Sequence, residues 1–401
     1  MQKIKSSDDF LRWADDPTRQ PAAFQVIDLR GETGRLLSLP LAHCLFLSCN
    51  LEPAATAHII ESGGIVIPDR KRFKFAPHRS RLYTVEELFA GYHGSPKTGY
   101  HCTYDYKIYY EYVKQGREAV PIDISLHRRL HDHSITDALE EELRGHKVVA
   151  IMGGHDMERR EPDYLKVAQV ARRLAREGYL VITGGGPGAM EAAHFGAWFA
   201  GRPDGDMTDA LAQMAVRPEG APPGKEYDDQ DWLYRAWCIR SAYPQSAEDA
   251  ERYRSIGIPT WFYGHEPPSV FATRIAKYFA NSVREDGLLM VANHGIIFAP
   301  GNAGTVQEIF QDAAQNYYGT SGHRSPMILL GTDYWTKTYP AWPLLQKLAA
   351  RKAKEGFPDL ISLTDNEQEI TEVIRAYDPA NHRADAPGPH MPPSHDQKEQ
   401  V

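Results

Sequence analysis

From Lys147 onward, short apolar runs alternate regularly with amphipathic segments. The run KVVAIM at 147–152 is rich in β-branched residues and leads into two glycines, which is typical of a strand and its turn. Residues 162–177 then have apolar positions at helical spacing, begin with a proline and are followed by Gly178, as a helix would be. YLVIT at 179–183 predicts a second strand, whose glycine turn opens another helix.

The same alternation continues beyond residue 257. We expect strands over 258–263, 295–300, 325–331 and 360–364, and helices over 268–285, 301–318 and 335–354. Strands that alternate with helices imply a parallel sheet with right-handed crossovers. The predicted fold class is therefore α/β, with a Rossmann-like doubly wound parallel sheet over 145–378.

Three further regions depart from this pattern. Residues 1–140 hold short apolar runs broken by glycine, proline and charge, and predict a smaller N-terminal α/β domain. Residues 202–256 are polar and rich in Asp, Pro and Tyr, which suggests a long surface excursion. The tail over 379–401 is rich in Pro, His and charge, a composition typical of disorder.

Composition narrows the class of protein. The chain has 401 residues, of which 42% are hydrophobic and 24% charged, and its net charge is −8. The chain lacks the overall positive charge that is typical of nucleic-acid-binding proteins. No apolar run reaches the ~18 residues of a membrane span. The polar N-terminus lacks the features of a signal peptide, so we expect a cytoplasmic protein.

Metal sites and disulfides are not expected either. The four cysteines form no CxxC pair and fit buried reduced thiols. His127, His131 and His133 cluster in HRRLHDH, but without a matching third ligand we expect solvated side chains rather than a metal site. We therefore predict no metal and no cofactor.

Three glycine-bearing turns follow predicted strands, at Gly153-Gly154, 184–188 and 301–304. Ligands of open parallel sheets bind at the carboxyl ends of the strands. Glycine allows close backbone approach there, and the start of a helix offers free N–H groups to an anion. The alternative for any one turn is that its glycines only let helix and strand pack closely.

An NAD-type dinucleotide site is a second interpretation of the middle turn. Gly184, Gly186 and Ala189 fit G-x-G-x-x-A, but the acidic residue expected about 20 positions later falls at Asp204, away from a strand end. The P-loop pattern G-x-x-x-x-G-K-[ST] does not occur.

Two of the turns, taken together, indicate a protein family more specifically than either turn does alone. GGGPGAME, followed over 100 residues later by PGNAGTVQE, resembles the LOG-type Rossmann family of nucleoside 5′-monophosphate phosphoribohydrolases. MGGHD, TGGGPGAMEAAHFGA and NHGIIFAPG look more similar to its pyrimidine/purine nucleotide 5′-monophosphate nucleosidases. The resemblance covers about residues 145–335. It implies cleavage of the N-glycosidic bond of a nucleoside monophosphate to free base and ribose 5-phosphate, in a homodimer or higher homo-oligomer.

The resemblance also assigns roles to residues. Glu308 takes the position of the family's catalytic glutamate, and Gln307 stands where many relatives have a second glutamate. The expected phosphate and ribose contacts are Gly301, Asn302, Gly304, Thr305, Gly185, Gly186, Gly188 and Gln307. Asn302 replaces a glycine of the family's loop, and we expect it to tolerate left-handed backbone angles there.

Arg284 is the nearest match to the family's catalytic arginine. Arg274, Lys277, Asn281 and Arg284 are spaced to share one face of the predicted helix, which is either a site or a solvated charged face. The possible base or sugar contacts are Gly153, Gly154, His155, Met190 and Glu191, although Met190 also suits the core and Glu191 also suits a first helical turn.

Two functional classes remain open. Glu308 and Arg284 together favour a hydrolase. Asn302 and Gln307 favour a non-catalytic protein that binds a nucleotide or another phosphorylated ligand, such as a nucleotide sensor or a molybdenum-cofactor carrier, because one fold serves both roles.

Overall fold

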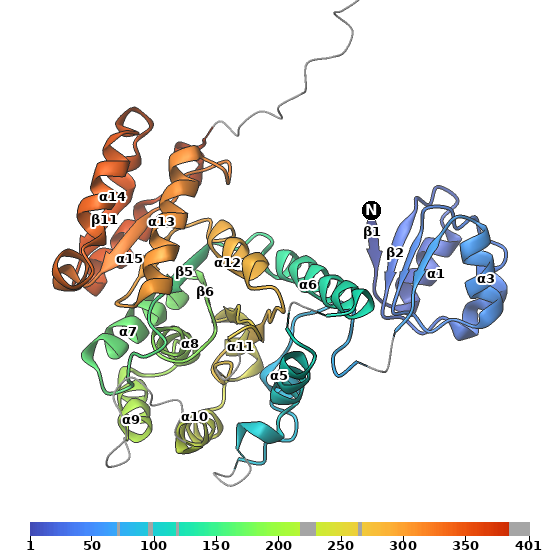
Figure 1. The fold of residues 1–401 in the computed structure, drawn as a ribbon, viewed down its shortest axis with the longest axis horizontal. Helices are drawn as coiled ribbons and strands as arrows, with labels where there is room; N and C mark the ends of the chain where they lie inside the picture. Colours follow the sequence, from blue (N-terminus) through green and yellow to red (C-terminus); the bar gives the residue numbers. More distant parts are fainter. Residues whose placement is uncertain (70–72, 95–98, 118–119, 217–229, 264–266, 385–401) are drawn as a thin grey trace, which may run out of the picture.

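The computed structural model describes residues 1–69, 73–94, 99–117, 120–216, 230–263 and 267–384. The described chain contains two parallel sheets, one of four strands and one of seven (Figure 1). No helix among these residues has the length and apolar character needed to cross a membrane.

The four-stranded sheet is built by residues 1–67. Its order is β1-β2-β3-β4, all parallel, with β1 at Gln2–Ile4, β2 at Ala22–Gln25, β3 at Leu45–Leu47 and β4 at Ile65–Ile67. The helical segments are α1 (Ser7–Asp15), η1 (Arg30–Glu32), α2 (Thr33–Leu36) and α3 (Pro53–Glu61). This unit has a hydrophobic core of its own, in which the Trp13 and Phe24 rings meet edge-on at 4.9 Å.

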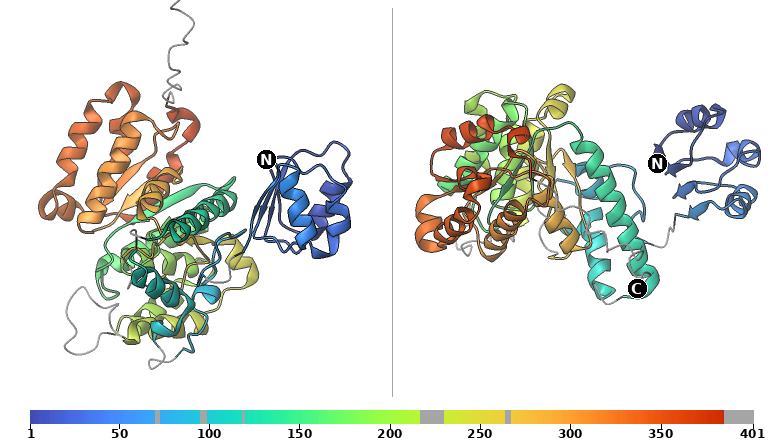
Figure 2. Two further views of the ribbon diagram at one scale, coloured as in Figure 1. Left: turned by 45° about the vertical axis from the view of Figure 1, so that its right-hand side comes forward. Right: turned by 90° about the horizontal axis from the view of Figure 1, so that it is seen from above.

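The segment that follows packs against the other sheet. It contains α4 (Val85–Leu88), η2 (Tyr100–Cys102), α5 (Tyr104–Lys114) and α6 (Ile122–Leu143). Their buried residues, such as Tyr112 and Ile135, belong to the core cluster of the seven-stranded sheet. The long helix α6 lies between the small sheet and the rest of the chain (Figures 1 and 2), and Glu141 accepts hydrogen bonds there from Lys3 and Lys5.

The seven-stranded sheet confirms the predicted α/β class. Its order is β11-β10-β9-β5-β6-β7-β8, and every pairing is parallel. The strands are β5 (Val148–Met152), β6 (Leu180–Thr183), β7 (Ser255–Gly257), β8 (Arg274–Ile275), β9 (Ile296–Phe298), β10 (Met327–Leu330) and β11 (Ile361–Thr364). From β5 the chain builds outward to β8 and then returns to place β9 on the other side of β5. The strand order therefore reverses at β5, where an open sheet forms its ligand crevice.

Helices and turns connect these strands and complete the core. They are α7 (Pro162–Arg176), α8 (Ala189–Trp198), α9 (Asp204–Met214), α10 (Gln230–Ala242), α11 (Ala247–Arg252), α12 (Asn281–Met290), α13 (Ala303–Tyr318), a π-helical turn at Tyr334–Thr338, α14 (Ala341–Ala350), η5 (Ala353–Glu355), η6 (Phe357–Leu360), α15 (Glu367–Ala376) and η7 (Pro379–His382). The expected helix over 335–354 is thus split before α14.

The expected surface excursion over 202–256 is wrong for its described part. Helices α9 and α10 pack on each other and bury Met207, Met214 and Trp232 in the main core, so this segment is not a polar surface loop. Residues 217–229 lie outside the described residues, as does most of the tail that we expect to be disordered, 385–401.

The largest error concerns residues 258–285. The third strand is β7 at Ser255–Gly257, and 258–263 forms a loop, in which Pro259 offers no N–H to a sheet ladder. The predicted helix over 268–285 begins only at Asn281, because Arg274–Ile275 pairs as edge strand β8. Arg274 and Lys277 therefore lie outside the helix, and of the four residues only Asn281 and Arg284 share a face of α12.

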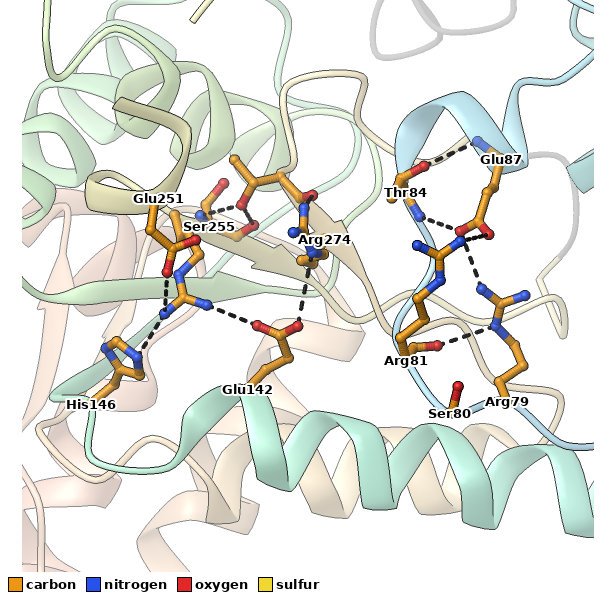
Figure 3. Close-up of polar contacts among 12 residues, drawn as sticks. Arg79, Ser80, Arg81, Thr84, Glu87, Glu142, His146, Glu251, Ser255 and Arg274 are labelled. Carbon is orange, nitrogen blue, oxygen red and sulfur yellow. Dashed lines mark hydrogen bonds and ion pairs between the residues drawn. The ribbon is translucent and has the colours of Figure 1, made fainter. Parts of the chain in front are cut away.

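Two of the three cations among them, Lys277 and Arg274, bind elsewhere in the fold. Lys277 is buried and donates to Asp105 of α5 at 2.8 Å. Arg274 lies at the sheet edge, where its Nε is 3.8 Å from Glu142 of α6 (Figure 3). Neither residue is part of the glycine turns.

Candidate active site

The three glycine turns lie against one another at the carboxyl ends of β5, β6 and β9. The Gly154 N–H donates to the Pro300 carbonyl at 2.9 Å, and the Ala189 N–H donates to the Gly154 carbonyl at 3.0 Å. The turn after β5 therefore bridges the other two. Because β5 marks the reversal of strand order, these turns meet where the topology of the sheet opens a crevice.

Glycine is required where the turns touch. A Cβ at Gly301 would lie 2.6 Å from the Gly154 nitrogen and would collide with the Thr305 hydroxyl. Gly188 has a φ of +68°, and a Cβ there would collide with the Gly154 carbonyl. Close backbone packing thus explains part of the glycine pattern, and it also fixes the shape of the loop that starts α13.

Asn302 is not left-handed, contrary to our expectation. Its φ of −91° and ψ of −152° are extended, so this position does not need glycine-like angles. The Asn302 amide donates to Asp156 Oδ2 at 2.7 Å, and its side chain does not cap α13. The N–H groups of the first turn of α13 are therefore left to water or to a ligand, as in anion sites at helix starts.

Thr305 and Glu308 project from the first two turns of α13. The buried Thr305 hydroxyl packs against Gly301, inside the loop. Glu308 is half-buried one turn later. Burial raises the pKa of the Glu308 carboxyl to about 7; the charge of Arg284 opposes this shift and that of Glu285 adds to it. A carboxyl with this pKa exchanges a proton near neutral pH.

Arg284 of α12 reaches toward the middle glycine turn. A Cβ at Gly184 would lie 2.7 Å from Met190 Sδ and 3.8 Å from a guanidinium nitrogen of Arg284. The guanidinium donates to Asn281 Oδ1 at 2.9 Å, and its buried Nε has no hydrogen-bond partner among the described residues. The structure thus brings Arg284, Met190 and the 184–188 turn to one place, and the charge of Arg284 acts on Glu308.

Glu191 and His155 differ in their surroundings. Glu191 is only 1% exposed and accepts two hydrogen bonds from Arg159, at 2.8 and 2.7 Å, and one from Tyr164 at 2.9 Å. The Glu191 carboxylate, which the sequence suggested as a possible sugar contact, is therefore bound within this buried network. His155 is exposed beside Gly188. Gly185 and Gly186 lie in the turn after β6, whereas Gly304 lies in the first turn of α13.

Residues without a motif also support the site. Tyr334 donates to the Gly301 carbonyl at 2.9 Å, and Asp156 holds Asn302. One turn beyond Glu308, Asp312 is 3% exposed, and burial raises its pKa well above the usual range. Only the i,i+4 spacing of Glu308 and Asp312 was visible in the sequence; the other contacts join segments far apart in the chain.

The histidine cluster is solvated at His133, as we expected, but not at His127 and His131. His127 and His131 are buried in α6, where His131 bonds to the Tyr83 hydroxyl at 2.9 Å and to Asp132 at 3.0 Å. These histidines pack among aromatic rings because α6 covers the main core. Across the described ranges, no group of His, Cys, Asp and Glu has the arrangement of a metal site.

Comparison with known proteins finds one family model and several structures. The model of the SLOG cluster4 family matches residues 146–202, which include the first two glycine turns. Among curated proteins none matches this chain.

Two solved structures resemble it at low identity. One is the molybdenum cofactor binding protein from the phototrophic bacterium Rippkaea orientalis, with 17% identity, a TM-score of 0.36 and coverage of 58% of this chain and 97% of that one. The other is the Moco carrier protein from Chlamydomonas reinhardtii, with 15% identity, a TM-score of 0.35 and coverage of 58% and 99%.

Proposed function

We propose that this protein hydrolyses the N-glycosidic bond of a nucleoside 5′-monophosphate and releases the free base and ribose 5-phosphate. The observation that carries the proposal is Glu308, a half-buried carboxyl with a pKa raised to about 7, one turn beyond a glycine loop at the crevice of the sheet. Arg284 supplies a cation whose charge reaches it.

Each group has a defined task in this reaction. The 301–305 loop and the start of α13 bind the 5′-phosphate, which fixes the sugar relative to α13. Glu308 accepts a proton from water as the water oxygen bonds to C1′. The electron pair of the C1′–N bond leaves with the base, which takes up a proton from solvent, and Glu308 afterwards returns to solvent the proton that it took from water. While it is still ionised, the Glu308 carboxylate also stabilises the positive charge that develops on the sugar.

The direct test is to incubate the pure protein with AMP, GMP, IMP, CMP and UMP and to quantify free base by chromatography. We expect release from at least one nucleotide, with a loss of ~100-fold or more in Glu308→Ala. Exposed Glu372 of α15 provides a matched control, since Glu372→Ala removes a helical carboxylate far along the chain from the glycine turns. Release that survives Glu308→Ala contradicts the catalytic assignment.

A non-catalytic binding protein is the second candidate. It is supported by one observation: Gly301 packs on Gly154 and Thr305 without contact to Glu308, so a ligand at the 301–305 loop would not require a catalytic Glu308. The same incubation separates the two functions when binding is measured in parallel by calorimetry. A protein that binds the nucleotides and releases no base is a sensor or carrier.

A further inference from the structure

The contact between α12 and α13 is polar and includes an acidic residue next to Arg284. The Gln307 amide donates to Glu285 Oε1, and the Asn281 amide donates to Glu285 Oε2 at 2.8 Å. One turn further along α13, Gln311 donates to Asp286, the residue after Glu285 in α12. Glu285 is therefore held from two sides, by one residue of α12 and one of α13.

These bonds orient the carboxylate without using up its acceptors. Each oxygen of Glu285 accepts one amide N–H, whereas an ionised carboxylate has about four lone-pair sites. Glu285 is only partly buried, and Gln307 beside it is exposed, so the group is open to a ligand. Its negative charge also contributes to the raised pKa of Glu308, which shows that the two carboxyls are near each other.

The position of Glu285 suggests which part of a ligand it meets. Its partner Gln307 precedes Glu308 in α13, and both follow the 301–305 loop. With a phosphate at the loop and the reacting C1′ at Glu308, the sugar ring lies between them. Sugar hydroxyls donate hydrogen bonds, and a fixed carboxylate is a strong acceptor for them.

We propose that Glu285 is a specificity-determining residue, which binds the hydroxyls of the ligand's ribose and selects ribo- over 2-deoxyribo-phosphates. This inference rests on the proposed function, because it takes from it that the ligand contains a pentose phosphate. It also accounts for Gln307, where the family resemblance leads one to expect a glutamate. In this chain α12 provides the carboxylate, and the amide at 307 holds it in place.

The test is to measure binding of ribose 5-phosphate and 2-deoxyribose 5-phosphate by calorimetry, which needs no turnover. Wild-type protein is expected to bind ribose 5-phosphate about tenfold or more tightly than 2-deoxyribose 5-phosphate, since a hydrogen bond to a charged group is lost with the 2-deoxy sugar. The quantity compared among variants is this ratio of the two dissociation constants. In Glu285→Gln this ratio falls toward one, mainly through weaker ribose 5-phosphate binding. Asp286→Asn is the matched control: it makes the same change at the next residue, in a similar contact, and keeps the wild-type ratio.

Other outcomes overturn the proposal in distinguishable ways. If wild-type protein binds both sugars equally, or if Glu285→Gln keeps the wild-type ratio, Glu285 does not select the sugar, while the nucleosidase proposal stands. If the folded wild-type protein binds neither sugar phosphate, Glu285 recognises no pentose phosphate and this proposal fails, whereas the nucleosidase proposal is decided by base release alone. Glu285→Asp retains the charge and partly restores the ratio, which separates recognition from a loss of folding.

Discussion

At the scale of single residues, the glycines at the crevice have different tasks, although the sequence presents them alike. Gly301 is packed on Thr305 and Gly154, whereas a Cβ at Gly304 would meet no atom within 4 Å. The pattern GNAG could predict a loop at a strand end, but it could not show which glycine is enclosed. That distinction depends on Gly154, almost 150 positions earlier in the chain.

Alanine at these two positions should therefore have opposite effects. Gly301→Ala forces the loop away from Gly154, and we expect it to lower the free energy of unfolding by ~1–3 kcal/mol. Gly304→Ala, in the first turn of α13, should be neutral or stabilise the protein by up to ~1 kcal/mol, because alanine favours helix. Urea unfolding without ligand measures both, and equal destabilisation by the two variants would be inconsistent with the packing described.

The half-buried carboxyl of Glu308 should lower the stability of the protein at high pH. Its pKa rises from 4.5 in a free chain to about 7 in the folded one, so the folded state holds the proton more tightly. Between these pH values the contribution of Glu308 to stability falls as the pH rises. At pH 8 the free energy of unfolding of Glu308→Gln should then exceed that of wild type by about 1–2 kcal/mol, and this difference should shrink toward pH 5.

Thermal unfolding of both proteins across this pH range checks the expectation. Glu372→Gln, an exposed change of the same kind, controls for the loss of a surface charge. A pH-independent difference between Glu308→Gln and wild type would mean that Glu308 titrates normally.

At the scale of elements, the segment before α12 shows why helical spacing alone predicts the wrong element. Phe271, Ile275, Tyr278 and Phe279 recur at helical spacing, yet all are buried around strand β8 and its flanks. The chain is held extended by partners that no local pattern reveals: Asp105 binds Lys277, and Asp132 of α6 accepts from the Phe279 and Ala280 N–H groups at 2.9 and 2.8 Å. Strands such as β5 and β9 were predictable because their apolar runs are short and bounded by glycine or proline.

Asp132 thereby fixes the start of α12 and, through it, Arg284 and Glu285. Asp132→Ala leaves two buried N–H groups without their acceptor, and we expect it to lower the free energy of unfolding by ~3 kcal/mol and to slow base release. Glu140→Gln, an exposed change on the same helix, should alter neither. Urea unfolding and the base-release assay measure the two effects, and full stability of Asp132→Ala would refute this role.

At the scale of the whole molecule, the candidate site belongs to the seven-stranded sheet alone. Its core and the three glycine turns come from residues beyond Phe75, while residues 1–67 form a separate sheet with a separate core. The two parts meet at α6, where Lys3 and Lys5 pair with Glu141. The sequence indicated a smaller α/β unit at the N-terminus, but the attachment of 82–143 to the larger core depends on tertiary contacts.

A chain that lacks residues 1–69 should consequently keep its ligand site. We expect its dissociation constant for ribose 5-phosphate to stay within about twofold of the full-length value, because no residue of the small sheet lies among the described contacts of the glycine turns. Calorimetry measures the binding, and circular dichroism confirms that the shortened chain is folded. Loss of binding by a folded, shortened chain would show that the small sheet takes part in the site.

The most direct test of the catalytic claim is the pH dependence of kcat/KM for base release by wild type and Glu308→Gln. If the Glu308 carboxylate takes a proton from water, the wild-type value rises as the pH increases through about 7, where this carboxyl loses its proton. Glu308→Gln should still bind nucleotide but should lose ~100-fold or more in kcat/KM, and this rise with it. A variant that retains both the rate and the rise near pH 7 would contradict the account.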